Sequence, residues 1–96
     1  MGTSILKDSY DMIDYFGTQF LVDWEYTQLT EKIFRAVYTK NRTTVAVYVD
    51  ELDMIQVVVD YRDELGHTMQ DLSVQFTGSM RKGAAINFLY SVMIKI

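Results

Sequence analysis

The feature that most constrains the fold is a two-residue alternation of apolar and polar side chains that recurs through the middle of the chain. Residues 34–38, 45–49, 55–59 and 72–76 each place an apolar or aromatic side chain at every second position. A period of two is typical of β-strands that bury one face. Short polar stretches separate these segments, so we predict consecutive antiparallel strands joined by tight turns.

Turn lengths predict the register of these strands. A two-residue turn at residues 41–42, a three-residue loop at 51–53 and a six-residue loop at 63–68 keep one apolar face continuous, whereas a slip of one residue would turn a strand over. Asp53 suits the second loop because aspartate tolerates a left-handed backbone. The expected pairs are Phe34–Val49, Ala36–Val47, Tyr38–Val45, Val49–Ile55, Val47–Val57, Val45–Val59, Ile55–Phe76, Val57–Val74 and Val59–Leu72.

The N-terminal part of the chain changes its period. Residues 4–16 have apolar side chains in one helical arc and acids in the other, which predicts an amphipathic helix capped by Thr3 or Ser4 and ended by Gly17. Residues 20–26 then alternate, which predicts a further half-buried strand. Residues 30–40 would also suit a helix by spacing, but the hairpin is favoured because residues 33–38 are rich in strand formers.

The chain ends with residues spaced for a helix that Ser79 can cap. Its apolar arc covers roughly two thirds of the helix circumference. This is much wider than the arc of about 100° that a helix needs to pack on one core. The surplus is expected to be buried inside the monomer, between the sheet and the first helix, or in a homodimer, or against a different partner protein. The residues we expect to self-associate in the second case are Phe88, Val92, Met93 and Ile96.

These elements predict one domain over residues 1–96 with an α+β fold. We expect an N-terminal helix, an antiparallel β-meander of four to five strands and a C-terminal helix, with both helices packed on one face of the sheet. The chain has no cysteine and one histidine, which rules out disulfides, thiol nucleophiles and metal motifs that need two histidines. We predict no catalytic activity, no metal site and no cofactor.

One loop leaves an alternative open. His67 follows Asp63 and Glu64, and a carboxylate beside an imidazole is half of an acid–base pair. No nucleophile is tied to this loop by spacing, so we interpret it as a polar turn in which Gly66 supplies an unusual backbone angle. The alternative is a small ligand-binding domain or enzyme that uses the His67 loop.

The segment of residues 78–85, Gly-Ser-Met-Arg-Lys-Gly-Ala-Ala, resembles the start of the second helix in double-stranded-RNA-binding domains. The order helix, sheet, helix is also similar, and the resemblance implies RNA contacts by Arg81 and Lys82. Phosphate contacts dominate nucleic-acid affinity, however, and the chain has a net charge of −4. We therefore expect no direct nucleic-acid binding and expect both cations to point into water.

The distribution of charge is more informative than any motif. Residues 50–76 hold Arg62 against seven acids, a net charge of −6, and residues 1–30 hold Lys7 against five acids, a net charge of −4. Fields of this sign attract basic partners, although the same acids would also serve solubility. The expected partner-binding acids are Asp8, Asp11, Asp14, Asp60, Asp63, Glu64 and Asp71, with Arg35 and Tyr48 as anchors on the second face of the sheet.

We accordingly predict a small acidic, non-catalytic protein–protein interaction module that blocks a basic groove of a nucleic-acid-handling protein. The composition is similar to the general profile of phage-encoded inhibitors of host defence, anti-CRISPR proteins among them. The alternative is a homo-oligomeric structural or accessory protein. We expect a cytoplasmic location and no membrane span, because an acid interrupts the first residues and the apolar stretch of residues 84–96 is short of about 20 residues.

Overall fold

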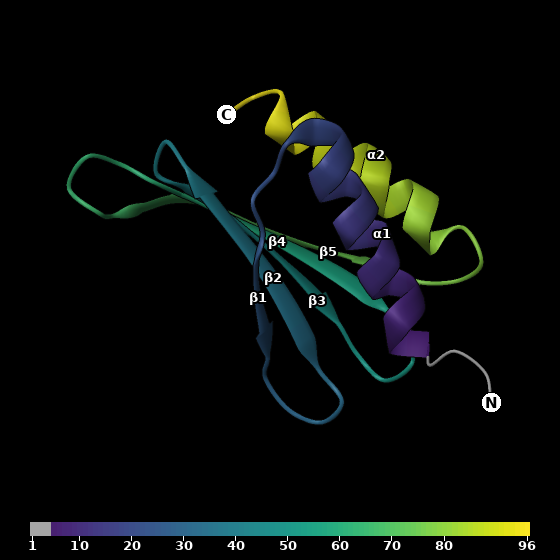
Figure 1. Ribbon diagram of the computed structural model, residues 1–96. Helices are drawn as coiled ribbons and strands as arrows, with labels where there is room; N and C mark the ends of the chain where they lie inside the picture. The colour runs from purple at the N-terminus through teal and green to yellow at the C-terminus, as the bar shows by residue number, and fades with distance from the viewer. Residues whose placement is uncertain (1–4) are drawn as a thin grey trace.

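The computed structural model describes residues 5–96, with the side chains of residues 11–69 and 71–96. Five strands form one antiparallel sheet in the order β1-β2-β3-β4-β5, so the predicted meander is confirmed. Both helices lie on the same face of this sheet, as predicted (Figure 1). The elements are α1 (Ile5–Phe20), β1 (Glu25–Gln28), β2 (Phe34–Lys40), β3 (Thr43–Val49), β4 (Ile55–Arg62), β5 (Thr68–Phe76) and α2 (Arg81–Met93).

The register of all nine predicted pairs is confirmed. Asn41 and Arg42 both have positive φ, 53° and 64°, which is the geometry of the two-residue hairpin turn. Asp53 has a φ of 60° and supplies the left-handed residue of the next loop. The last loop is one residue shorter than predicted, because an irregularity between Tyr61 and Arg62 places Arg62 opposite Thr68.

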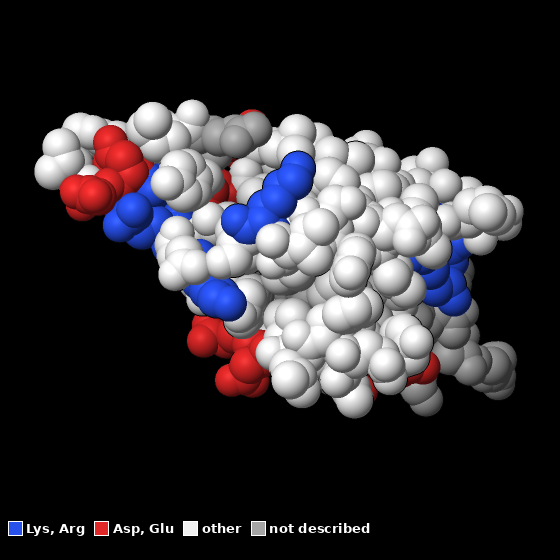
Figure 2. Space-filling model, turned by 90° about the horizontal axis from the view of Figure 1, so that it is seen from above, with Lys and Arg blue, Asp and Glu red and all other residues white. Residues whose placement is uncertain are grey.

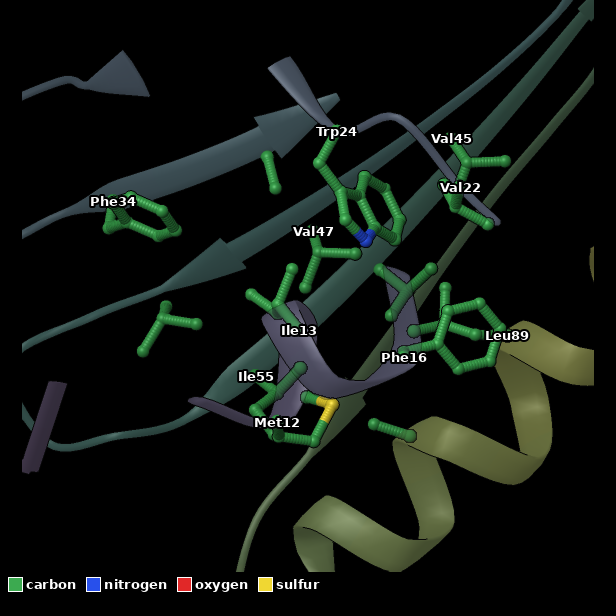
Figure 3. Close-up of a cluster of buried hydrophobic side chains, with 14 residues drawn as sticks. Met12, Ile13, Phe16, Val22, Trp24, Phe34, Val45, Val47, Ile55 and Leu89 are labelled. Atoms are coloured by element: carbon green, nitrogen blue, oxygen red, sulfur yellow. The ribbon is translucent and has the colours of Figure 1, made fainter. Parts of the chain in front are cut away.

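The core lies between the helices and the concealed face of the sheet. Figure 3 shows Ile13 and Phe16 of α1 and Leu89 of α2 projecting toward side chains of the sheet such as Val47 and Ile55. All five of these side chains are completely buried. Burying a side chain of this size stabilises the fold by about 1.5–3 kcal/mol relative to leaving it in water. The apolar side chains at alternate positions of the strands therefore pack against both helices and stabilise their position on the sheet.

The first helix is longer than predicted, and Gly17 does not end it. The helix continues to Phe20, and the left-handed residue that ends it is Leu21, with a φ of 57°. The Val22 N–H donates to the Gly17 carbonyl over 2.9 Å, which completes a Schellman-type C-terminal cap. Gly17 has a packing role instead, because a Cβ atom there would lie 2.8 Å from Cδ1 of Trp24. The predicted caps, Thr3 and Ser4, lie outside the described residues.

The strand predicted over residues 20–26 is wrong in its extent, since β1 begins only at Glu25. Val22 and Trp24 are nevertheless buried, as the alternation required. Both residues belong to an irregular segment that connects α1 to the sheet. Trp24 packs on Tyr38 with ring centroids 6.3 Å apart and near-perpendicular planes. The burial of Val22 and Trp24 was therefore predicted correctly, although strand pairing does not produce it, whereas Phe20 and Tyr26 on the same predicted face are exposed.

The start of α2 also corrects the sequence analysis. Ser79 does not cap the helix, whose N-cap is Met80 and has no side-chain cap hydrogen bond. Arg81 does not point into water: its guanidinium forms an ion pair with the fully buried carboxylate of Asp53. Its Nε–H also donates to the Asp53 carbonyl over 2.7 Å, and Nη1 donates to the Gly78 carbonyl over 2.8 Å. Arg81 thus ties the β3–β4 loop to the segment that begins α2.

Candidate functional site

The structure separates the predicted partner-binding acids into two surfaces. Asp11 and Asp14 are exposed on α1, on the helical side of the molecule. Asp60 and Asp71 lie on the other face of the sheet, which no described helix covers. Asp8 belongs to α1, but its side chain is outside the described residues. The acids therefore do not form one continuous site, and the pair on the sheet is the more unusual arrangement.

Asp60 of β4 and Asp71 of β5 are direct cross-strand partners. Like charges opposite each other on neighbouring strands destabilise a sheet, since their side chains are only about 5 Å apart at Cβ. One Asp60 oxygen, Oδ2, is 3.2 Å from Nη2 of Arg62. The other, Oδ1, is buried and has no hydrogen-bond partner among the described residues. Arg62 therefore offsets only part of the negative charge.

Asp63 has a structural role in the tip of the same hairpin. Its Oδ1 accepts hydrogen bonds from the backbone N–H groups of Leu65 and His67, both at 2.9 Å. Its Oδ2 lies 3.5 Å from Nδ1 of His67. The carboxylate is therefore occupied by its own loop, whereas Glu64 beside it is exposed. Aspartate is common in turns because its side chain can accept a hydrogen bond from the backbone N–H two residues later. This role of Asp63 could therefore have been expected from the sequence.

The His67 loop is exposed and is held by hydrogen bonds to Asp63 and Arg62. The His67 side chain is 74% exposed, and Nη1 of Arg62 donates to the Gly66 carbonyl over 3.0 Å. Gly66 has a φ of 86°, as the sequence suggested. A cavity of about 370 Å³ near this loop is lined by Arg42, Tyr61, Asp63, Glu64 and Leu65, so His67 is not part of its wall.

The two predicted anchors, Arg35 and Tyr48, are cross-strand partners on the open face of the sheet. Both are half-buried, and Nε of Arg35 has no hydrogen-bond partner among the described residues. Tyr48 pairs with Gln56, which is four residues from Asp60 along β4. At about 3.3 Å per residue, the anchors are displaced from the acidic pair by roughly 13 Å along the strand direction. They share a face with Asp60 and Asp71 but occupy its other end.

Figure 2 looks onto the C-terminal ends of both helices. Carboxylates gather at the protruding left end, where the β4–β5 hairpin lies, with basic side chains beside them. Most of the remaining surface in this view is uncharged. One group of carboxylates therefore lies at an end of the elongated molecule, whose principal extents are 49, 26 and 22 Å, and other acids, such as Asp11 and Asp14 of α1, are exposed elsewhere.

The uncharged surface includes apolar residues that the sequence analysis did not single out. Leu21 and Ile94 are 88% and 66% exposed, and Phe20 packs on Tyr90 with ring centroids 5.2 Å apart. These residues lie where both helices end. The residues predicted for self-association are placed differently: Phe88, Val92, Met93 and Ile96 are partly buried and pack against the core of their own chain.

A cavity of about 430 Å³ opens beside the end of α2. Its wall is largely apolar and includes Leu72 of β5, which is 40% exposed, and Lys95 at the end of the chain. The full lining is Thr43, Val59, Tyr61, Leu72, Val92, Lys95 and Ile96. The cavity arises because the β4–β5 hairpin extends beyond the helical layer, leaving part of its apolar face without a cover (Figure 1).

Within the described part of the chain, no three His, Cys, Asp or Glu side chains are grouped so that they could hold a metal ion. Neither α1 nor α2, the helices of residues 5–96, combines the length and the apolar character needed to cross a membrane. Comparisons with protein-family models, with curated proteins and with solved structures found no match to this chain.

Proposed function

We propose that this protein is a non-catalytic interaction module that binds a basic protein surface through its β4–β5 hairpin. The observation that carries the proposal is the pairing of Asp60 with Asp71 across the two strands of an uncovered sheet face. A basic side chain of a partner would relieve the repulsion of these carboxylates and gain two acceptors at once.

Two further features support binding at this hairpin. Glu64 is exposed at the tip and adds charge of the same sign, and residues 60–71 hold four acids against Arg62, a net charge of −3. The hairpin projects beyond the helices, so a partner can reach it without meeting the helical layer (Figure 1). Long-range attraction by such a cluster speeds association with a basic partner and weakens as salt is added.

The finer form of this proposal is an inhibitor that occupies the basic groove of a nucleic-acid-handling protein, as a phage-encoded inhibitor or anti-CRISPR protein does. Carboxylates on a narrow projecting hairpin would take the place of phosphates in such a groove. This form requires a cytoplasmic location and excludes direct nucleic-acid binding. Arg81, one of the two cations for which the resemblance implies RNA contacts, forms an ion pair with Asp53 and is unavailable for phosphate.

The test compares two triple variants with the same loss of charge. One carries Asp60→Asn, Glu64→Gln and Asp71→Asn in the hairpin, and the control carries Asp23→Asn, Glu25→Gln and Glu31→Gln elsewhere on the surface. Binding of a deca-arginine peptide is measured by calorimetry at low and at physiological salt. We expect the hairpin variant to lose about tenfold or more in affinity and the control to lose less than about threefold.

Equal losses in both variants would mean that the acids act only through net charge, and the proposal would be wrong. Absence of binding to the unaltered protein at low salt would also contradict it. A change of affinity with salt that is the same for all three proteins would show that the hairpin has no special part in the attraction.

A second candidate function is self-association as a homo-oligomeric accessory protein. It is favoured by the exposed apolar side chains of Phe20, Leu21, Tyr90 and Ile94 at the helix ends. Light scattering over a wide concentration range measures the oligomeric state. Ile94→Glu should dissociate an oligomer without unfolding the chain, because Ile94 is 66% exposed. A mass equal to 11.2 kDa at every concentration would exclude this function.

A further inference from the structure

β5 leaves one long edge of the sheet open. It is the longest strand, with nine residues, and its strand neighbour is β4 alone within the described part of the chain. Edge strands are usually protected by lysine, proline, short length or bulges. β5 has neither lysine nor proline, Asp71 is its one charge, and the irregularity in its pairing lies at the tip end. The opposite edge, β1, has only four residues.

The hydrogen-bonding pattern shows which backbone groups face outward from this edge. The Arg62 N–H donates to the Arg42 carbonyl over 3.0 Å, so the even-numbered residues of β4 bond toward β3. Because bonding alternates along an antiparallel ladder, the odd-numbered residues of β4 bond to the even-numbered residues of β5. The N–H and C=O groups of Asp71, Ser73 and Gln75 therefore point away from the sheet. All three residues are exposed.

The side chains along this edge specify what an added strand would need. On the open face, a residue opposite Asp71 would have its Cβ about 5 Å away, within reach of a salt bridge. Asp60, whose side chain is 25% exposed, lies on the next strand behind Asp71 and adds negative charge to this face. On the helical side, Leu72 is 40% exposed and forms one wall of the apolar cavity. The edge therefore suits a strand that alternates basic and apolar side chains.

We propose that the outer edge of β5 binds an extended segment of the partner protein as a sixth strand, antiparallel to β5, with an arginine or lysine opposite Asp71. Strand addition supplies affinity through backbone hydrogen bonds and specificity through alternate side chains. Apolar residues of the segment cover Leu72 on the helical side. The inference rests on the proposed function, since it specifies how the hairpin takes its basic partner.

The probe is a nine-residue peptide of alternating arginine and valine, matched to the length of β5. Binding is measured by calorimetry, and amide hydrogen exchange is followed by NMR with the full chain. We expect the outward N–H groups of Asp71, Ser73 and Gln75 to exchange about tenfold or more slowly when the peptide is bound. The amides of Leu72 and Val74 already bond to β4 and should change little.

The decisive variant is Ser73→Pro, with Ser73→Ala as its control. Proline removes the outward N–H of residue 73 but no hydrogen bond to β4, and proline is tolerated on edge strands. Both variants lose the 2.8 Å hydrogen bond from Nε2 of Gln56 to Oγ of Ser73, so this loss does not distinguish them, whereas only Ser73→Pro lacks the backbone N–H. We expect Ser73→Pro to weaken peptide binding about tenfold or more and Ser73→Ala to leave it within about threefold.

A second measurement keeps the test valid if Ser73→Pro fails to fold. The same peptide with its bonding amides N-methylated cannot add to the edge, so it should not bind the unaltered protein. Equal binding by the methylated peptide, or equal binding by the two Ser73 variants, would overturn strand addition. The proposed function would survive that result if Asp71→Asn still weakened binding, whereas no binding of any arginine peptide would overturn both.

Discussion

The ion pair between Arg81 and Asp53 makes the sharpest stability prediction. Asp53 is completely buried, and the Arg81 side chain is 21% exposed. The guanidinium donates three hydrogen bonds, two to Asp53, which is 28 positions away in the sequence, and one to the nearby carbonyl of Gly78. Replacing Arg81 by methionine keeps most of the unbranched apolar stem of the side chain but removes all three.

The expected loss can be estimated from this geometry. Breaking a buried ion pair by removing one partner costs about 3–5 kcal/mol, and the partial exposure of Arg81 favours the lower end, about 3 kcal/mol. A chain of 96 residues has a total stability of roughly 5–14 kcal/mol. Arg81→Met should therefore remove a large part of the stability and lower the urea midpoint by about 1–3 M.

Urea unfolding followed by fluorescence measures this loss, because Trp24 is the only tryptophan and is buried. Lys82→Met is the matched control, since Lys82 is half-buried and makes no ion pair with the described residues. It should cost less than about 0.5 kcal/mol. A loss below about 1 kcal/mol for Arg81→Met would contradict the reasoning. So would additive effects of Arg81→Met and Asp53→Asn in a double-mutant cycle.

Three smaller perturbations follow from particular contacts. Gly17→Ala should lower the unfolding free energy by about 1–2 kcal/mol despite its better helix propensity, because the new Cβ would lie 2.8 Å from Trp24; higher stability would contradict this packing. Arg42→Gly should raise the thermal midpoint by the equivalent of about 0.5–1 kcal/mol, since Arg42 has a φ of 64°, and no change would argue against strain. Asp71→Asn should raise stability by a few tenths of a kcal/mol at low salt, as measured by urea unfolding, and by less at high salt, because it removes the repulsion with Asp60.

The sheet could be predicted closely because two independent signals agree along it. Alternation shows which face of each strand is apolar, and turn length then fixes which residues are opposite, as with Val47 between Ala36 and Val57. The end of α1 was misread because Val22 and Trp24 are buried at alternate positions without strand pairing. Alternating burial arises from any extended segment that crosses a core, so the sequence pattern alone does not distinguish the two.

The candidate site was only partly visible in the sequence. The register predicts that Asp60 and Asp71 share a face, because both follow from the same turn-length argument. The role of Arg81 could not be foreseen, since its partner Asp53 is 28 positions away and is brought near only by packing of α2 on the sheet. Local sequence patterns report neighbours in the chain, whereas contacts of this kind depend on the tertiary fold.

The placement of Asp71 is the strongest argument that the hairpin charge has a function beyond solubility. A carboxylate at position 75 would give the chain the same net charge but would face Gln56, an uncharged residue, instead of Asp60. An acid that serves only solubility has no advantage at a position where a neighbouring carboxylate repels it. An acid that binds a cation has one, because the two carboxylates together attract the cation more strongly. The two roles predict different outcomes for Asp71→Asn. Higher stability together with weaker binding of a basic peptide fits a binding residue, and higher stability with unchanged binding fits solubility alone.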